Sequence, residues 1–309
     1  MKIIFAGTPD FAVPALHYLL KSGHEIGAVY TQPDRPAGRG RTLRPSPIKT
    51  LALAENVPVY QPESFKAEAD IAQLRALHAD LMVVVAYGLI LPQAVIDTPR
   101  LGCINIHGSL LPRWRGAAPI HRALMAGDTQ TGITIMKIIK QLDAGDMLHK
   151  EYLSIQATDT ASDLHDKLAQ LGAIGLEKVI GQIEAGTVVA QIQDESLVTY
   201  AHKLEKTEAM LDWSKSAVEL DRQIRGLNAW PVAQTLYQGE ILRIWRAEIL
   251  TETESHLSAG QILESSKTFD VGTGAGVLRL LEVQLPGGKR IESKAFLNAH
   301  PVNGIQLGC

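Results

Sequence analysis

The sequence predicts an α/β protein in two parts, with a parallel sheet in its first half and a small β-barrel or sandwich in its second. Up to about residue 189, short apolar runs alternate with amphipathic stretches, which is typical of a parallel sheet covered by helices on both faces. After about residue 207, short strands follow one another closely, as in small all-β domains. A chain of 309 residues also suits two hydrophobic cores better than one. We therefore expect a first domain at 1–189, a linker at 190–206 and a second domain at 207–309.

The first domain is expected to alternate strands and helices along the chain. Apolar runs bounded by turn residues predict the strands, and apolar residues at helical spacing predict the helices. The expected strands are Lys2–Ala6, Glu25–Thr31, Val57–Tyr60, Leu81–Ala86, Gly102–Ile106, Ile133–Ile139 and Met147–Ile155. The expected helices are Phe11–Lys21, Ile71–His78 and Ala161–Ala185. Ligands of parallel sheets bind beyond the carboxyl ends of the strands, where Tyr87 and His107 fall.

The second domain is expected to open with one helix, Ser216–Leu227, and to continue in strands only. The expected strands are Ala233–Tyr237, Leu242–Ile249, Gly260–Glu264, Phe269–Thr273, Val277–Gln284 and Arg290–Ser293.

Charge and cysteine content restrict the class of protein. The formal net charge is −3, so any polyanionic partner has to meet a local basic patch. The two cysteines, Cys103 and Cys309, give neither a disulfide framework nor a zinc-binding spacing. The apolar run that follows Met1 is too short for a signal peptide, and no stretch approaches a membrane span. We expect a monomeric cytoplasmic protein that holds no metal.

Asn105 and His107 form the first candidate catalytic pair. They lie two residues apart at a predicted strand end, so their side chains point to the same face of the sheet. An amide that can donate to an oxygen atom, beside an imidazole that can move a proton, suits acyl transfer. A polar strand end without any chemistry is the alternative, and the spacing alone does not decide between the two.

A carboxylate further along the chain, Asp143, could orient His107 and stabilise its charged form. Asp143 stands in a Leu-Asp-Ala-Gly-Asp run, and Asp-Ala-Gly is equally good turn chemistry. The alternative for Asp143 is therefore a turn residue between two strands.

These residues belong to a pattern that resembles the folate-dependent formyltransferases. Asn105, His107 and Asp143 match the Asn–His–Asp constellation of that family, and the run GSLLPRWRGAAPI at Gly108–Ile120 is similar to a signature found in it. Further similar stretches are Phe5–Ala12, Ala86–Pro92, Thr199–Ala201, Asp212–Trp213, Trp230–Pro231 and Leu285–Gly287. The resemblance spans nearly the whole chain. It implies a Rossmann-like catalytic domain and a C-terminal β-barrel of the oligonucleotide-binding type that holds tRNA.

The activity implied by the resemblance is transfer of the formyl group of 10-formyltetrahydrofolate to the amino group of methionine esterified to initiator tRNA. In that reaction Asn105 would donate to the formyl oxygen, His107 would stabilise it or move the proton, and Asp143 would orient His107. The resemblance requires no nucleophilic serine or cysteine and no metal. No nucleotide cofactor is expected either, because the turn after the first strand lacks the three-glycine fingerprint. The chain departs from the family at Lys137–Gln141, where an acidic residue and a glycine are usual.

The folate pocket is expected to be lined by Ala86–Leu91 and by the loop preceding Asp143. Backbone and apolar groups there suit a flat pterin ring whose edges form hydrogen bonds. The expected folate-binding residues are Tyr87, Gly88, Ile90, Leu91, Ser109, Leu110, Leu111 and Pro112. In the resembling family the bond that matches Leu111–Pro112 is typically cis. Ordinary core positions remain the alternative for Ile90 and Leu91.

A basic loop follows the second predicted strand, at Gln32–Lys49. It is too long for a simple turn, and its glycines and prolines are expected to prevent regular structure. A basic loop suits contact with RNA phosphates, and the resembling family carries one here that contacts the acceptor arm of tRNA. The residues expected to bind tRNA are Arg35, Arg39, Arg41, Arg44 and Lys49. A mobile, solvated loop is the alternative.

Other functions stay open on the sequence alone. One is formyl transfer to a small amine, such as an amino sugar nucleotide or glycinamide ribonucleotide, and another is hydrolysis of formyltetrahydrofolate. The basic loop and the Arg-Gly-Ala-Ala-Pro-Ile run favour tRNA as the acceptor. A folate- or RNA-binding protein without activity is the non-enzyme alternative, and the intact set of Asn105, His107 and Asp143 argues against it.

Overall fold

The computed structural model describes residues 1–37, 42–251, 256–263, 265, 267–300, 302 and 304–308, which form two compact units. Unit 1 comprises Met1–Pro119, Gln130–Ser154 and His165–Ala201, and unit 2 comprises Ile120–Thr129, Ile155–Leu164 and His202–Cys309. The structure therefore groups residues 190–201 with unit 1, where the sequence indicated a linker. Two short segments of the predicted first domain belong to unit 2.

Unit 1 is built on a seven-stranded sheet in the order β10-β9-β7-β6-β1-β2-β5. Its strands are β1 (Lys2–Gly7), β2 (Glu25–Tyr30), β5 (Val59–Tyr60), β6 (Leu81–Val85), β7 (Cys103–His107), β9 (Gln130–Lys137) and β10 (Met147–Ser154). From β7 to β5 all neighbours are parallel, as predicted. β9 runs antiparallel to both β7 and β10, so the expected parallel sheet carries an antiparallel pair at one edge.

The strand order reverses beside β1, which lies between β6 and β2. Such a reversal opens a crevice at the carboxyl ends of the strands, where α/β proteins bind their ligands. Gly7 at the end of β1 pairs with Val85 at the end of β6, and His107 ends the next strand. Thr8 ties these ends together, because its hydroxyl donates to the carbonyl of Tyr87 at 2.8 Å and accepts from the amide of Gln32 at 3.3 Å.

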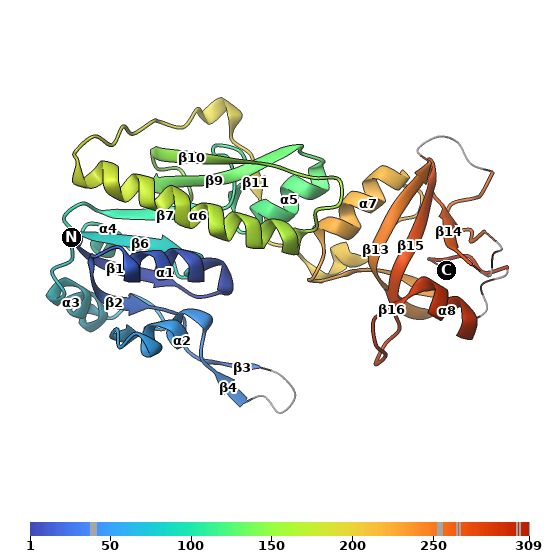
Figure 1. Ribbon diagram of the computed structural model, residues 1–309, viewed down its shortest axis with the longest axis horizontal. Helices are drawn as coiled ribbons and strands as arrows, with labels where there is room; N and C mark the ends of the chain where they lie inside the picture. Colours follow the sequence, from blue (N-terminus) through green and yellow to red (C-terminus); the bar gives the residue numbers. More distant parts are fainter. Residues whose placement is uncertain are drawn as a thin grey trace. The chain divides into compact units, whose positions relative to one another are not determined.

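Helices cover the sheet of unit 1. The helical elements are η1 (Asp10–Ala12), α1 (Val13–Lys21), α2 (Pro47–Ala54), α3 (Glu68–Ala76), α4 (Gln93–Ile96), α6 (Ala161–Glu184) and the short η2 (Glu195–Leu197), of which α6 begins in unit 2. α6 lies along the sheet, with Gly172 against Ile106 and Ile133 (Figure 1). α2 was not predicted, although Ser46 caps it by accepting from the amide of Lys49 and Pro47 opens it. A serine cap followed by proline is a helix start signal.

The predicted basic loop is partly regular, which corrects the expectation that glycine and proline prevent structure there. β3 (Arg35–Ala37) and β4 (Thr42–Arg44) form an antiparallel ladder in which Arg35 pairs with Arg44. The ladder forms a two-stranded sheet of its own, so Pro36 interrupts no larger sheet.

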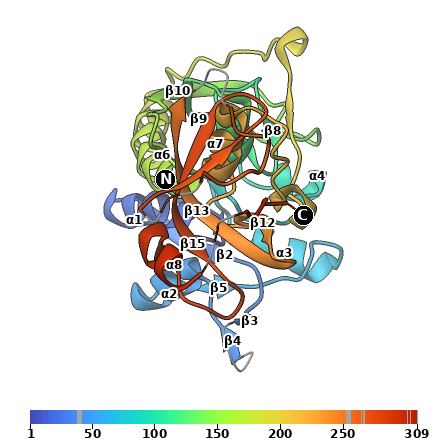
Figure 2. The ribbon, with the colours of Figure 1, turned by 90° about the vertical axis from the view of Figure 1, so that its right-hand side faces the viewer.

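Unit 2 holds an antiparallel sheet in the order β12-β13-β15-β14, with β16 paired to β15. The strands are β12 (Ala233–Tyr237), β13 (Glu240–Thr251), β14 (Phe269–Gly272), β15 (Val277–Gln284) and β16 (Ile291–Glu292). Figure 2 turns this sheet toward the viewer, with α8 (Ser293–Ala299) beside β15. α8 also contacts β16. α7 (Ala217–Gly226), close to the predicted helix, packs on β13. α8 was not predicted.

Short bridges close the sheet of unit 2 into the expected barrel. Ile262 bridges Val271 of β14, and Gln261 bridges Gln306. The amide of Gly308 then donates to the carbonyl of Leu236 in β12 at 2.9 Å. The predicted strand Gly260–Glu264 is reduced to these bridges, and its last residue lies outside the described residues.

Two further segments complete unit 2. α5 (Pro119–Ala126) was not predicted, and most of it belongs to unit 2. Arg122 holds this helix, because its guanidinium donates to the Glu208 carboxylate and to the carbonyl of His202. Glu208 stands in η3 (Lys206–Ala209). Within the described ranges, no helix is long and apolar enough to cross a membrane.

Candidate active site

His107 ends β7 at the carboxyl edge of the sheet and is 5% exposed. Its Nε2 lies 2.8 Å from the carbonyl oxygen of Trp114, which can only accept, so Nε2 carries a proton and donates. Its Nδ1 lies 3.6 Å from Oδ2 of Asp143. Both ring nitrogens therefore face oxygen atoms of the protein, and the imidazole plane is fixed between two loops.

Asp143 lies in the loop between β9 and β10, and its main chain has a positive φ of 48°. Its Oδ2 accepts a hydrogen bond from the amide of Gly116 at 2.8 Å, which aims the carboxylate at His107. A positive φ is uncommon for a residue with a side chain and is found where surrounding contacts hold it. Asp143 is therefore a turn residue, as the alternative interpretation had it, and also the partner of His107.

Asn105 lies two residues before His107 on β7 and is half-buried. The alternation of a strand puts both side chains on the same face of the sheet. In the part of the chain that the structure describes, the Asn105 amide has no hydrogen-bonded partner in the protein. It is therefore available to donate to a substrate oxygen.

Thr134 of β9 holds the loop after β7 by two hydrogen bonds. The hydroxyl of Thr134 accepts from the amide of Leu111 at 3.0 Å and donates to the carbonyl of Ser109 at 2.7 Å. The hydroxyl of Ser109 donates to the carbonyl of Arg113 at 2.6 Å, and Leu111 is buried against Met136 and Met147. Ser109 and Leu111 thus shape the loop, while Leu110 and Pro112 stay partly exposed. The Leu111–Pro112 bond is cis, as in the resembling family.

The residues of the loop after β6 differ widely in their exposure to solvent. Ile90 is 93% exposed, and Gly88 is exposed with a positive φ of 84°. Tyr87 and Leu91 are buried in the core, and burial raises the pKa of the Tyr87 phenol well above its ordinary value. Among the four residues predicted to bind folate here, Ile90 and Gly88 can meet a ligand directly, whereas Tyr87 and Leu91 are buried and the Tyr87 carbonyl already accepts from Thr8.

The basic hairpin β3–β4 places Arg35 opposite Arg44, and both are exposed. Like charges directly opposite one another destabilise a ladder unless an anion lies between them. Arg35 donates to Oε1 of Gln32 at 2.8 Å. Arg39 and Arg41 lie outside the described residues.

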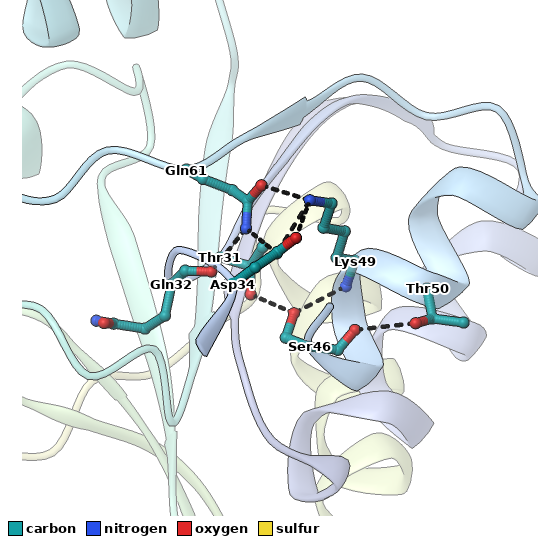
Figure 3. Close-up of polar contacts among 7 residues, drawn as sticks. All are labelled: Thr31, Gln32, Asp34, Ser46, Lys49, Thr50 and Gln61. Atoms are coloured by element: carbon teal, nitrogen blue, oxygen red, sulfur yellow. Dashed lines mark hydrogen bonds and ion pairs between the residues drawn. The ribbon is translucent and has the colours of Figure 1, made fainter. Parts of the chain in front are cut away.

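Lys49, the fifth residue predicted to bind tRNA, is engaged within the protein (Figure 3). Its ammonium donates to both carboxylate oxygens of Asp34, at 2.9 and 2.8 Å, and to Oε1 of Gln61 at 2.8 Å. These contacts match the three donors of an ammonium group. Gln61 in turn donates to Asp34 and to the carbonyl of Gln32. Lys49, Asp34 and Gln61 form what we call the hairpin-base cluster, because Asp34 precedes β3 and Lys49 follows β4.

Several residues of the site were not predicted from the sequence. The carbonyl of Trp114 and the amide of Gly116 hold His107 and Asp143, and they lie in the run that carried the resemblance. That run was a usable signal, because loops beside a site often carry the groups that bind or hold functional side chains. Gln193, which donates to the carbonyl of Asp143, had no such signal.

Residues 190–201, which the sequence assigned to the linker and which we call the return segment, support the loop after β7. β11 (Tyr200–Ala201) pairs in parallel with β8 (Arg115–Gly116), and the amide of Trp114 donates to the hydroxyl of Thr199 at 2.9 Å. A side chain at Gly116 would put its Cβ 2.9 Å from the carbonyl oxygen of Ala201, at a φ of 116°, so only glycine fits. The groups that hold His107 and Asp143 are therefore fixed by residues near 200.

This arrangement suits attack of an amine on a carbonyl carbon. A free amide can stabilise the oxygen on which negative charge develops, and a fixed imidazole–carboxylate pair can handle the proton. The groups stand at the carboxyl edge of the sheet, on β7 and beyond it, and β6 separates β7 from β1, where the strand order reverses.

Comparison with known proteins agrees with this chemistry. Residues 1–180 match the family model described as formyl transferase, and residues 203–301 match the model of the formyl transferase C-terminal domain. The chain is 55% identical over 308 residues to a methionyl-tRNA formyltransferase of Methylococcus capsulatus, with 100% of both chains covered. It is 54% identical over 303 residues to one of Methylobacillus flagellatus, covering 98% of this chain and 97% of that protein.

Among solved structures, an N-formyltransferase from Helicobacter canadensis, in complex with folinic acid and dTDP-3-aminofucose, has a similar fold. The TM-score is 0.68 at 17% identity, and the match covers 94% of this chain and 100% of that one. Because the identity is low, this likeness concerns the fold alone.

Proposed function

The chain belongs to the formyl transferase family, and we propose that it transfers the formyl group of 10-formyltetrahydrofolate to the α-amino group of methionine carried by initiator tRNA. The observation that carries the proposal is the meeting of three groups at one edge of the sheet. These are the amide of Asn105, the imidazole of His107 and the carboxylate of Asp143. Whole-length similarity to methionyl-tRNA formyltransferases supports tRNA as the acceptor.

The transfer proceeds by direct attack. The amine nitrogen bonds to the formyl carbon, and the carbonyl oxygen of the formyl group gains negative charge, which the Asn105 amide stabilises by donating a hydrogen bond. The amine nitrogen loses a proton, the bond from the formyl carbon to N10 of the folate breaks, and N10 takes up a proton. His107 lies beside Asn105 on the same face and assists this movement of protons, while Asp143 keeps its ring in place.

The folate donor binds along the loops after β6 and β7. Gly88 and the highly exposed Ile90 offer main-chain groups and an apolar surface for the flat pterin ring, and Leu110 and Pro112 border the second loop. An isoleucine that is 93% exposed leaves most of its apolar surface in water until a ligand covers it.

The tRNA acceptor is met in part by the basic hairpin. Arg35 and Arg44 stand side by side without an acidic residue opposite either, and a phosphate group between them would relieve their repulsion. Arg39 and Arg41 add to the same positive charge along the chain. Lys49 supports the hairpin indirectly, because its ammonium is bound to Asp34 and Gln61 in the hairpin-base cluster.

Transfer to a small amine is the second candidate. The fold is shared with an N-formyltransferase whose complex contains an amino sugar nucleotide, at 17% identity. The 55% identity to a methionyl-tRNA formyltransferase over the whole chain favours tRNA.

The deciding experiment gives the purified protein labelled 10-formyltetrahydrofolate with one of four acceptors: methionyl-initiator tRNA, glycinamide ribonucleotide, an amino sugar nucleotide or water alone. We expect label on methionyl-tRNA and less than about one per cent of that rate with the others. Preferred labelling of either small amine would replace tRNA by that acceptor. Release of labelled formate at the same rate with and without acceptor would make the protein a hydrolase.

A further inference from the structure

A buried hydrogen-bond network connects the return segment to the Asp143 loop. Gln193 is 4% exposed and Arg115 is fully buried. The Gln193 amide donates from Nε2 to the carbonyl of Asp143 at 2.7 Å and to the carbonyl of Gly145 at 2.8 Å. Its Oε1 accepts from Nε of Arg115 at 3.0 Å. One side chain thus holds the main chain on both sides of Ala144.

The orientation of the Gln193 amide follows from its partners. Arg115 can only donate, and the two carbonyl oxygens can only accept, so Oε1 must face Arg115 and Nε2 must face the loop. Arg115 is fixed in turn by Glu195, whose Oε1 lies 2.7 Å from its Nη2. Gln191 adds main-chain support, because it exchanges two hydrogen bonds of 2.8 Å with Met147, which follows the loop.

The loop needs such support because its backbone is unusual. Asp143 adopts a positive φ of 48°, and Gly145 lies so close to Lys137 that a Cβ would stand 1.9 Å from the carbonyl oxygen of Lys137. The Asp143 side chain has its own contacts, with the amide of Gly116 and with His107. Gln193 holds the main chain of the same residue from the other side.

We propose that Gln193 is a positioning residue for formyl transfer: its carboxamide fixes the backbone of residues 143–145 so that the Asp143 carboxylate is directed at His107. This inference rests on the proposed function. Gln193 lies outside both family matches, which end at residue 180 and begin at residue 203. Gln193 touches no reacting atom and acts through Asp143.

The test compares the same substitution at two positions. Gln193→Glu keeps an oxygen toward Arg115 but replaces the donor facing the two carbonyls by a second oxygen. Gln191→Glu is the matched control, because the Gln191 side chain is exposed and its main-chain bridge is unaffected. We expect Gln193→Glu to lower kcat about ten- to a hundredfold, with KM for folate and for tRNA within about twofold, because misplacement of a catalytic group lowers the rate far more than it lowers binding. Gln191→Glu should keep the parent kcat.

A double variant separates positioning from general damage. If Gln193 acts through Asp143, then Gln193→Glu should change kcat by less than about twofold in an Asp143→Asn background. An undiminished effect in that background, or parent kcat in a folded Gln193→Glu protein, would overturn the proposal.

A spectroscopic readout makes the test independent of the acceptor. The NMR signals of the Gly116 amide and of the His107 ring nitrogens should change in the same direction in Gln193→Glu as in Asp143→Asn, and stay unchanged in Gln191→Glu. Unmoved signals in Gln193→Glu would overturn the positioning role. If the parent protein fails to formylate methionyl-tRNA, the proposed function fails, and these signals still decide whether Gln193 places Asp143. If Gln193→Glu does not fold, Gln193→Met, which is similar in length and uncharged, takes its place in every arm.

Discussion

His107 and Asp143 meet although one ends β7 and the other lies in the loop between β9 and β10: Nδ1 of His107 lies 3.6 Å from Oδ2 of Asp143. Neither side chain finds this position alone. The Trp114 carbonyl fixes the far nitrogen of the ring, and the Gly116 amide fixes the carboxylate. Main-chain groups of one short segment, residues 114–116, therefore hold both side chains of the pair.

Removal of either polar group from β7 should abolish most of the activity. We expect Asn105→Ala and His107→Ala each to lower kcat/KM about a hundredfold or more, because loss of one donor to a developing oxyanion has an effect of this size. The thermal midpoint of Asn105→Ala should stay close to the parent value, since its amide has no partner in the described structure. Turnover near the parent rate in either folded variant would remove that residue from the mechanism.

The two aspartates of the loop before β10 should behave differently. Asp143→Asn keeps an acceptor for the Gly116 amide but loses the charge facing His107. Asp146→Asn alters a residue whose carbonyl accepts from the amide of Lys137, and that hydrogen bond survives the substitution. We expect kcat to fall at least about tenfold further in Asp143→Asn than in Asp146→Asn, with a changed pH–rate profile in the first variant alone. Equal kcat in the two variants would show that Asp143 was the wrong choice.

Neutralisation of the hairpin arginines should weaken tRNA binding and spare folate binding. The triple variant Arg39→Gln, Arg41→Gln and Arg44→Gln should bind methionyl-tRNA less tightly. Its slope of log affinity against log salt should be shallower by up to about one unit for each phosphate that the arginines no longer neutralise. The control variant, with the same change of charge, replaces Lys21, Lys66 and Arg75, which are exposed on unit 1. Unchanged affinity and slope in the hairpin variant would discard the RNA role of the loop.

The direction in which tRNA affinity changes distinguishes two roles for the hairpin-base cluster. The ammonium of Lys49 holds the pKa of the Asp34 carboxyl below its usual value by hydrogen bonding. If Lys49 contacts RNA itself, Asp34→Ala frees the ammonium and tightens tRNA binding. If the cluster positions the hairpin, Asp34→Ala and Lys49→Met both weaken it. We expect both to weaken binding, as measured by titration with methionyl-tRNA.

Cys103 should be unreactive in the native protein. Burial raises the pKa of its thiol to about 12, and its Sγ contacts the carbonyl of Ile96 at 3.6 Å. At pH 8 roughly a thousandfold less thiolate is present than at an ordinary cysteine, and only the thiolate reacts. In a Cys309→Ser background, iodoacetamide should modify the unfolded chain and leave the folded chain unmodified over the same period. Rapid labelling of the folded chain would contradict this.

The sequence predicted the sheet edge of unit 1 because its signals are local. Buried parallel strands such as Leu81–Val85 are continuous apolar runs, and the side chains that follow them mark the carboxyl ends. The order of residues around Asn105 and His107 placed both on one face of β7 without any knowledge of the fold. Asp143 needed the resemblance to be chosen, since its turn chemistry is equally real.

Long-range pairing explains most of what the sequence did not predict. Strand direction is set by the neighbour and not by the strand's own residues, so the antiparallel course of β9 had no local signal. The Gln261 bridge and the Gly308 hydrogen bond that close the barrel involve single residues without any periodicity. The role of Gln193 depends on hydrogen bonds to a loop about fifty residues earlier in the chain, which no local pattern indicates.

The parallel pairing of β8 with β11 also sets an order of events during synthesis. The ribosome completes residues 114–116, and with them the supports of His107 and Asp143, long before it adds residues 199–201. At about 5–20 residues per second, the interval lasts several seconds. A nascent chain that ends before residue 199 carries all three proposed catalytic side chains and lacks the segment that holds their loop. Catalytic competence is therefore expected to arise only after this segment has emerged, as arrested chains of graded length would reveal.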